Sequence, residues 1–112
     1  MNVRIQRQRT KGWRMPEGAI YVGRPTIYGN PYNVTATNSA GYAVARYRRD
    51  MEYGMRHWLP TWRASFFGRL RGHDLACFCG LCEAHRDGLP LGVVCPDCPP
   101  CHADVLLELA NR

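Results

Sequence analysis

The cysteines of this chain are grouped in one short segment. All six cysteines of the 112 residues lie between Cys77 and Cys101. A small protein uses such a density of thiols either for disulfide bonds or for a metal ion. The chain starts MNVRIQRQRTKGW, without the apolar stretch of a signal peptide, and no apolar run reaches membrane-spanning length. We therefore expect a soluble, cytoplasmic protein with a zinc site rather than disulfide bonds.

Two C-x-x-C pairs within this segment have the spacing of structural zinc sites. Cys79 pairs with Cys82, Cys95 pairs with Cys98, and twelve residues separate the two pairs. Two tight turns can direct four thiolates onto one tetrahedral ion. His85 offers a second arrangement, because it can take the place of Cys79 beside the other three cysteines. Either set fills all four positions, so we expect a structural zinc that folds a polar loop.

Positive charge is concentrated in the N-terminal two thirds of the chain. Residues 1–72 hold thirteen basic and three acidic residues, whereas residues 73–112 hold two basic and six acidic residues. The two parts therefore carry net charges of +10 and −4 with histidines neutral. This distribution favours a polyanionic partner, such as nucleic acid, a nucleotide or another phosphate. Fourteen of the fifteen basic residues are arginines, which a GC-rich genome would also produce without any functional demand.

The apolar pattern predicts alternating strands and helices in a single domain, residues 1–112. The expected strands are residues 3–6, 19–22 and 74–78. The expected helices are a first one capped by Ser39 and stopped by Gly54, a second over residues 60–70 and a last over residues 102–110. Because helices connect the strands, we expect an α/β or α+β fold with a small, partly parallel sheet covered by helices and a zinc-stabilised loop.

Several segments together resemble a known but uncharacterised family. They are Val22-Gly23-Arg24-Pro25-Thr26, Gly29-Asn30-Pro31-Tyr32, Leu75-Ala76-Cys77-Phe78-Cys79 and the segment from Cys101 to Asn111, with Gln6-Arg7 and Gly12-Trp13 before them. They are similar to the domain of unknown function 4326 family of bacteriophages and bacteria, and the resemblance implies a phage-encoded protein. Typical members have only a few residues between the C-x-C pair and the C-H-A-D segment. The loop of about residues 79–100 therefore resembles a cysteine-rich insertion.

The resemblance also bears on the choice of zinc ligands. A self-contained insertion implies its own four ligands, namely Cys82, His85, Cys95 and Cys98. The other candidates would then form a cluster belonging to the family itself, namely Cys77, Cys79, Cys101 and His102. The family has no established activity, so the resemblance names no reaction.

Cys101 and His102 are candidate catalytic residues. They lie at the start of the last expected helix, where unpaired N–H groups favour anions and lower the pKa of a cysteine. A thiolate beside a histidine can act as a nucleophile or complete a second metal site. The alternative is a purely structural cysteine packed beneath the strand that carries Cys77.

Candidate ligand-binding residues come from the N-terminal part of the chain. Arg24 and Asn30 follow an expected buried strand, which is where α/β folds often place their ligands. An arginine there can contact phosphate through two parallel hydrogen bonds. Trp13 can stack on a base while Arg7 and Arg9 contact a phosphate backbone.

Three functional hypotheses follow from these residues. The first, which the sequence favours, is a small zinc-binding protein that binds nucleic acid or a nucleotide or phosphate ligand through its arginine-rich N-terminal surface. The second is an enzyme that acts on a nucleotide or nucleobase through Cys101 and His102. The third is a phage adaptor that binds a host protein through its cysteine-rich loop.

Overall fold

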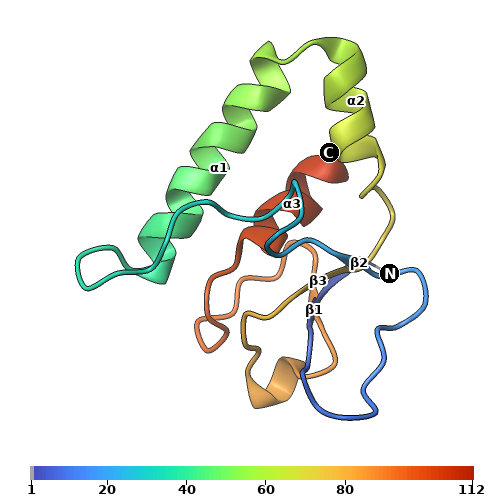
Figure 1. Cartoon of the computed structure of the whole chain (residues 1–112), viewed down its shortest axis with the longest axis vertical. Coiled ribbons are helices and arrows are strands. Elements are labelled where there is room, and N and C mark those ends of the chain that lie inside the picture. The colour runs from blue at the N-terminus through green and yellow to red at the C-terminus, as the bar shows by residue number, and fades with distance from the viewer. Residues whose placement is uncertain (1) are drawn as a thin grey trace.

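The computed structural model describes residues 2–112, and over that range it contains one four-stranded sheet and three α-helices (Figure 1). The strands are β1 (Val3–Gln6), β2 (Ile20–Tyr21), β3 (Leu75–Cys77) and β4 (Leu89–Pro90). The helices are α1 (Ala40–His57), α2 (Pro60–Gly68) and α3 (His102–Ala110), and a short 3-10 helix, η1 (Glu83–His85), lies in the cysteine-rich loop. The mixed α/β class expected from the sequence is confirmed. No helix of the described part is both long and apolar enough to cross a bilayer.

The sheet has the strand order β2-β3-β1-β4. Strand β3 lies between β1 and β2 and runs parallel to both, with Leu75 paired to Arg4 on one side and to Ile20 on the other. Strand β4 runs antiparallel to β1 and forms the other edge. The sheet is therefore partly parallel, as predicted. The sequence does not predict β4, because a two-residue strand that ends in proline has no alternating pattern and fits only a sheet edge.

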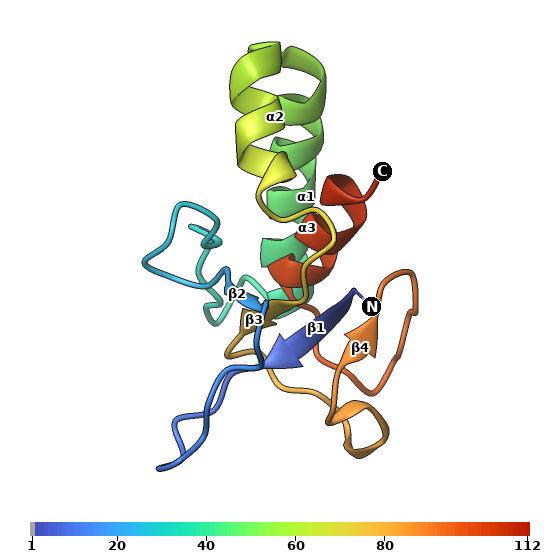
Figure 2. The same cartoon turned by 90° about the vertical axis from the view of Figure 1, so that its right-hand side faces the viewer.

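Helix α3 lies between the sheet and the hairpin formed by α1 and α2 (Figures 1 and 2). The sequence predicts that Val105, Leu106 and Leu109 face inward, and each of these side chains is at most 1% exposed. Leu107 is buried as well, because α3 is covered on more than one side. These residues pack in one apolar core with Tyr47 of α1. The core therefore fixes the start of α3, which carries Cys101 and His102.

Helix α1 begins where the sequence predicts but continues past its expected end. The Ser39 hydroxyl caps the first turn by accepting a hydrogen bond from the Tyr42 N–H at 3.1 Å. The prediction that Gly54 stops the helix is wrong, because Gly54 is buried within α1 and its carbonyl accepts from the Trp58 N–H at 3.0 Å. A Cβ added to Gly54 would lie 2.5 Å from Cε2 of the Trp58 indole. Gly54 therefore makes room for Trp58.

A buried arginine joins the sheet to the cysteine-rich loop. Arg4 of β1 is 0% exposed, and its Nε donates to Oδ1 of Asp104 in α3 at 3.0 Å. Its Nη1 donates to the Gly80 carbonyl at 3.1 Å, and its Nη2 donates to the Pro99 carbonyl at 3.0 Å. Gly80 and Pro99 lie at the two ends of the loop. One guanidinium thus holds both ends against the core, although the sequence of this strand gives no sign of it.

Candidate metal centres and the adjoining cavity

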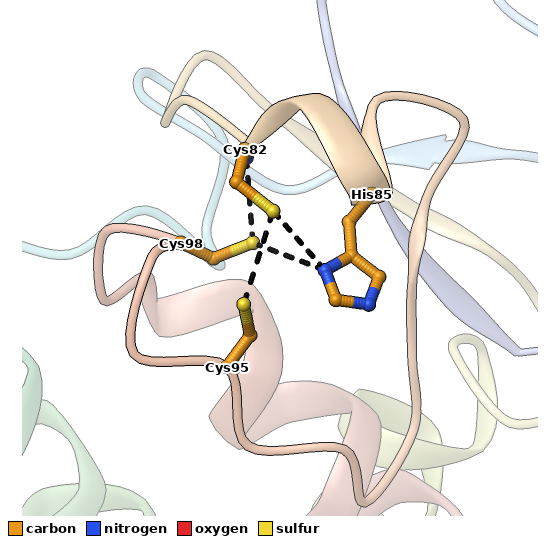
Figure 3. A group of neighbouring side chains, drawn as sticks. All are labelled: Cys82, His85, Cys95 and Cys98. Carbon is orange, nitrogen blue, oxygen red and sulfur yellow. Dashed lines mark hydrogen bonds between the residues drawn. The ribbon is translucent and has the colours of Figure 1, made fainter.

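One group of side chains that could hold a metal ion lies in the loop between β3 and α3 (Figure 3). It comprises Cys82, His85, Cys95 and Cys98, whose ligand atoms all lie within 4.8 Å of one another, and we call it the loop cluster. Sγ of Cys82 is 3.2 Å from Nδ1 of His85 and 3.8 Å from Sγ of Cys95, and Sγ of Cys98 is 3.7 Å from Nδ1 of His85. Zinc bonds of about 2.0–2.3 Å give tetrahedral edges of about 3.3–3.8 Å, so the loop cluster is close to the size of a zinc site.

Two local turns bring these ligands together. Cys82 precedes η1, and the His85 N–H donates to the Cys82 carbonyl at 3.0 Å, so the two side chains point toward one another (Figure 3). The Cys98 N–H closes a second turn by donating to the Cys95 carbonyl at 3.3 Å. Burial raises the pKa of the Cys82 thiol, but hydrogen bonds with Cys98 and His85 outweigh burial and lower this pKa to about 7. Cys82 therefore favours the thiolate form that binds metal, whereas burial raises the pKa of Cys98 in the same cluster.

The structure separates the two ligand sets that the sequence leaves open. It places His85 in the loop cluster and places Cys79 in another group, with Cys77 and Cys101. The Sγ atoms of this second group also lie within 4.8 Å of one another, and those of Cys77 and Cys79 are 3.8 Å apart. We call it the cavity cluster. All six cysteines are free thiols, and the two clusters could hold metal ions such as zinc.

Hydrogen bonds within the cavity cluster shift the pKa values of its three thiols in different directions. Bonds with Cys101 and Cys79 lower the pKa of Cys77 far below its ordinary value, although burial opposes this. The hydrogen bond with Cys77 raises the pKa of Cys101, so the lowered pKa expected at the helix start is wrong for Cys101. A bond with Cys101 lowers the pKa of Cys79, but Cys77 and burial together raise it to about 11. A cation is needed before all three sulfurs become thiolates at once.

His102 lies beside the cavity cluster in a fixed orientation. Its Nε2 donates to the Val22 carbonyl at 2.7 Å, and its ring packs edge-on against Tyr47 with the centroids 5.2 Å apart. The carbonyl can only accept, so Nε2 carries the hydrogen. In the neutral ring Nδ1 is then an acceptor, and it lies 3.9 Å from Sγ of Cys101, within hydrogen-bond distance of that thiol. Of the predicted catalytic pair, Cys101 lies within the cavity cluster and His102 adjoins it.

A cavity of about 590 Å³ adjoins these residues. Its lining includes all three cysteines of the cavity cluster and His102. It also includes Arg9, Tyr21, Arg24, Asn30, Tyr32 and Phe78. Segments far apart in the sequence therefore meet at one cavity, and they include the four longer segments on which the family resemblance rests.

Two arginines of the N-terminal segment lie over aromatic rings. The Arg9 guanidinium carbon is 4.2 Å from the centroid of Phe78, and that of Arg7 is 4.4 Å from the centroid of Tyr21. Such cation–π contacts hold an otherwise irregular basic segment near the cavity. Arg9, Tyr21 and Phe78 line the cavity, whereas Arg7 and the half-buried Trp13 lie outside the lining. The two aromatic residues are not among the candidates predicted from the sequence, although Phe78 lies between two cysteines of the cavity cluster.

The side chains of Arg24 and Asn30 line the cavity and also hold its loop in shape. Arg24 donates from Nε to the Asn30 carbonyl at 2.7 Å and from Nη2 to the Tyr32 carbonyl at 3.3 Å. Asn30 donates from Nδ2 to the Ala43 carbonyl at 3.2 Å, and its Oδ1 accepts from the Tyr32 N–H at 2.9 Å. Asn30 therefore positions the loop against α1, while the exposed Arg24 adds positive charge to the cavity.

The fold and the two clusters define a small mixed α/β protein with cysteine-rich groups that could hold metal ions. The chain belongs to the family described as Domain of unknown function (DUF4326), whose model matches residues 5–112. No curated protein and no solved structure matches the chain. The family resemblance seen in the sequence is therefore confirmed.

Proposed function

We propose that this protein binds zinc and holds a nucleotide or a related phosphate-bearing ligand in the cavity. One observation carries the proposal: arginines, aromatic rings and the segments that resemble the family all converge on this cavity. Its volume of about 590 Å³ falls within the roughly 300–1,000 Å³ of small-molecule sites. A single nucleotide is a ligand of that size with both an anionic and an aromatic part.

The lining offers a partner for each part of such a ligand. Arg9 stacks on Phe78, which leaves its in-plane N–H groups able to donate to phosphate oxygens. Arg24 adds charge, but its Nε and Nη2 already donate to loop carbonyls, so Arg9 makes the main phosphate contact. The ring of Tyr21 packs edge-on against Phe78 with the centroids 5.8 Å apart, and these rings offer an aromatic surface for a base.

Zinc in the loop cluster supports this function as a structural ion. Four protein ligands leave no open position, so the ion would hold the loop rather than react. Cys79 and Pro100, at the two ends of the loop, line the cavity. Fixing the loop therefore fixes one wall of the ligand site.

Nucleic acid is the second candidate, and the N-terminal segment favours it. Residues 9–14 are exposed except for the half-buried Trp13, and three of them are basic, namely Arg9, Lys11 and Arg14. A single strand can place several phosphates along such a segment and one base in the cavity. Because each phosphate contact releases counterions, its affinity would fall steeply with added salt.

Calorimetric titration of adenosine monophosphate, with inorganic phosphate in a separate arm, tests the proposal. The wild type should bind the nucleotide, and Arg9→Met should weaken binding roughly tenfold, or about 1.4 kcal/mol. Arg56→Met is the matched control, because Arg56 is exposed on α1 outside the cavity lining and should leave affinity unchanged. The proposal fails if the wild type binds neither probe or if the two variants behave alike. Tighter binding of an oligonucleotide with a steep salt dependence would favour the second candidate.

A further inference from the structure

The two clusters differ in the number of ligands that the protein supplies. The loop cluster brings four ligand atoms within 4.8 Å of one another, whereas the cavity cluster brings only the three sulfurs of Cys77, Cys79 and Cys101. Zinc in proteins is usually four-coordinate. An ion in the cavity cluster therefore needs a fourth ligand from outside this set.

The fourth ligand of an ion in the cavity cluster would come from the cavity. All three cysteines belong to the cavity lining. His102 is the nearest further donor, but its Nδ1 is not part of the group that lies within 4.8 Å. The hydrogen bond from Nε2 to the Val22 carbonyl holds the ring beside the sulfurs and restrains it from moving among them.

The positive charge of a buried arginine also favours an ion with three thiolate ligands. A divalent cation with three thiolates has one net negative charge, which is costly to bury without a partner. Arg4 is fully buried and donates to the carbonyl of Gly80, the residue after Cys79. Asp104 also pairs with this guanidinium, so Arg4 offsets that charge only in part.

We infer that the cavity cluster is an open zinc site whose fourth ligand is exchangeable. That ligand is water in the free protein, or an anionic group of the molecule in the cavity. Zinc with three protein ligands and an open position makes bound water acidic and activates it for hydrolysis. The identity of the cavity molecule rests on the proposed function, but the open position does not. A metal-bound Cys101 thiolate no longer donates to Nδ1 of His102, so His102 is placed to accept a hydrogen bond from the bound water.

Cobalt substitution of the full chain, with azide as the probe, tests this inference. The wild type should take up two Co²⁺ ions, and azide should change its visible absorption bands. Cys79→Ala should lose one ion and the whole azide response. His85→Cys is the matched control, because it keeps the loop cluster closed with four cysteines and should retain both ions and the response.

The inference is overturned if the wild type binds two ions but azide leaves its spectrum unchanged. It is also overturned if the wild type binds a single ion and the Cys79→Ala variant still binds it. A measurement on the wild type covers the case in which Cys79→Ala does not fold. Nitrogen-15 NMR of the zinc form should show metal-bound Nδ1 for His85 and not for His102, and metal-bound Nδ1 at both would overturn the open site. An azide response without nucleotide binding would refute the proposed function and leave the open site standing.

Discussion

Replacing Arg4 by methionine should destabilise the protein by about 3 kcal/mol. Methionine keeps part of the buried volume, so the main loss is the charge and its hydrogen bonds. The Gly80 and Pro99 carbonyls lose their donors, at about 1 kcal/mol or more each where water cannot replace them. Breaking a fully buried ion pair costs about 3–5 kcal/mol, but the side chain of Asp104 is 35% exposed and water can solvate it, so losing this pair adds only about 1 kcal/mol.

Thermal unfolding followed by circular dichroism measures this loss. At about 2.1 cal/mol/K per residue, a chain of 112 residues should lose about 13 °C in Tm for 3 kcal/mol. Arg14→Met removes the same charge from an exposed position and should change Tm by less than about 2 °C. Adding Asp104→Leu to Arg4→Met should restore part of the loss, because no unpaired carboxylate then remains. The reasoning is refuted if Arg4→Met and Arg14→Met have the same Tm.

Three further changes test separate parts of the structure. Gly54→Ala should destabilise α1 by about 1–3 kcal/mol because its Cβ meets the Trp58 ring. Gly41→Ala should instead stabilise α1 by about 0.5 kcal/mol, because its Cβ makes only an ordinary contact with Oγ of Ser39 at 3.8 Å; equal urea midpoints would contradict this. The hydrogen bond from Arg48 lowers the pKa of Glu108, so this pair stabilises the protein at pH values above the pKa of Glu108 in the unfolded chain. Because both side chains are half-exposed, the stabilisation is at most about 0.5 kcal/mol, and it is lost as pH falls through the folded pKa. Glu108→Gln should therefore be slightly less stable than the wild type at about pH 6, and the difference should vanish once pH falls below the lowered pKa of Glu108; a difference that persists there would contradict this. Metal removal by a chelator should speed trypsin cleavage at the one arginine of the cysteine-rich loop and leave the helical circular dichroism largely intact; unchanged cleavage would show that no metal orders the loop.

Local patterns in the sequence predict most of the regular structure. The stripe of apolar residues in α3 and the Ser39 cap of α1 depend on neighbours within a few residues, and both are confirmed. Gly54 is misjudged because its role depends on the Trp58 indole, which a pattern based on single residues does not place. Strand β4 exists only because β1 lies beside it.

The candidate sites show the same division between local and distant information. Spacing predicts that cysteines converge, since two short turns suffice to present them. Spacing alone does not assign Cys79, whose neighbour Cys101 lies at the far end of the loop. The partners of Arg4, in α3 and at both ends of the loop, are equally distant in sequence. Long-range pairings of this kind become visible only when the chain is folded.

Native mass spectrometry of the reduced, purified chain tests most directly whether these sulfurs hold metal. The account predicts two zinc ions per chain, and each Zn²⁺ should replace two protons of the metal-free chain. Zinc should fall to one ion when the cavity cluster loses a cysteine. A chain at the mass of the metal-free thiol form, or one lighter by the hydrogens lost to disulfide bonds, would contradict the account.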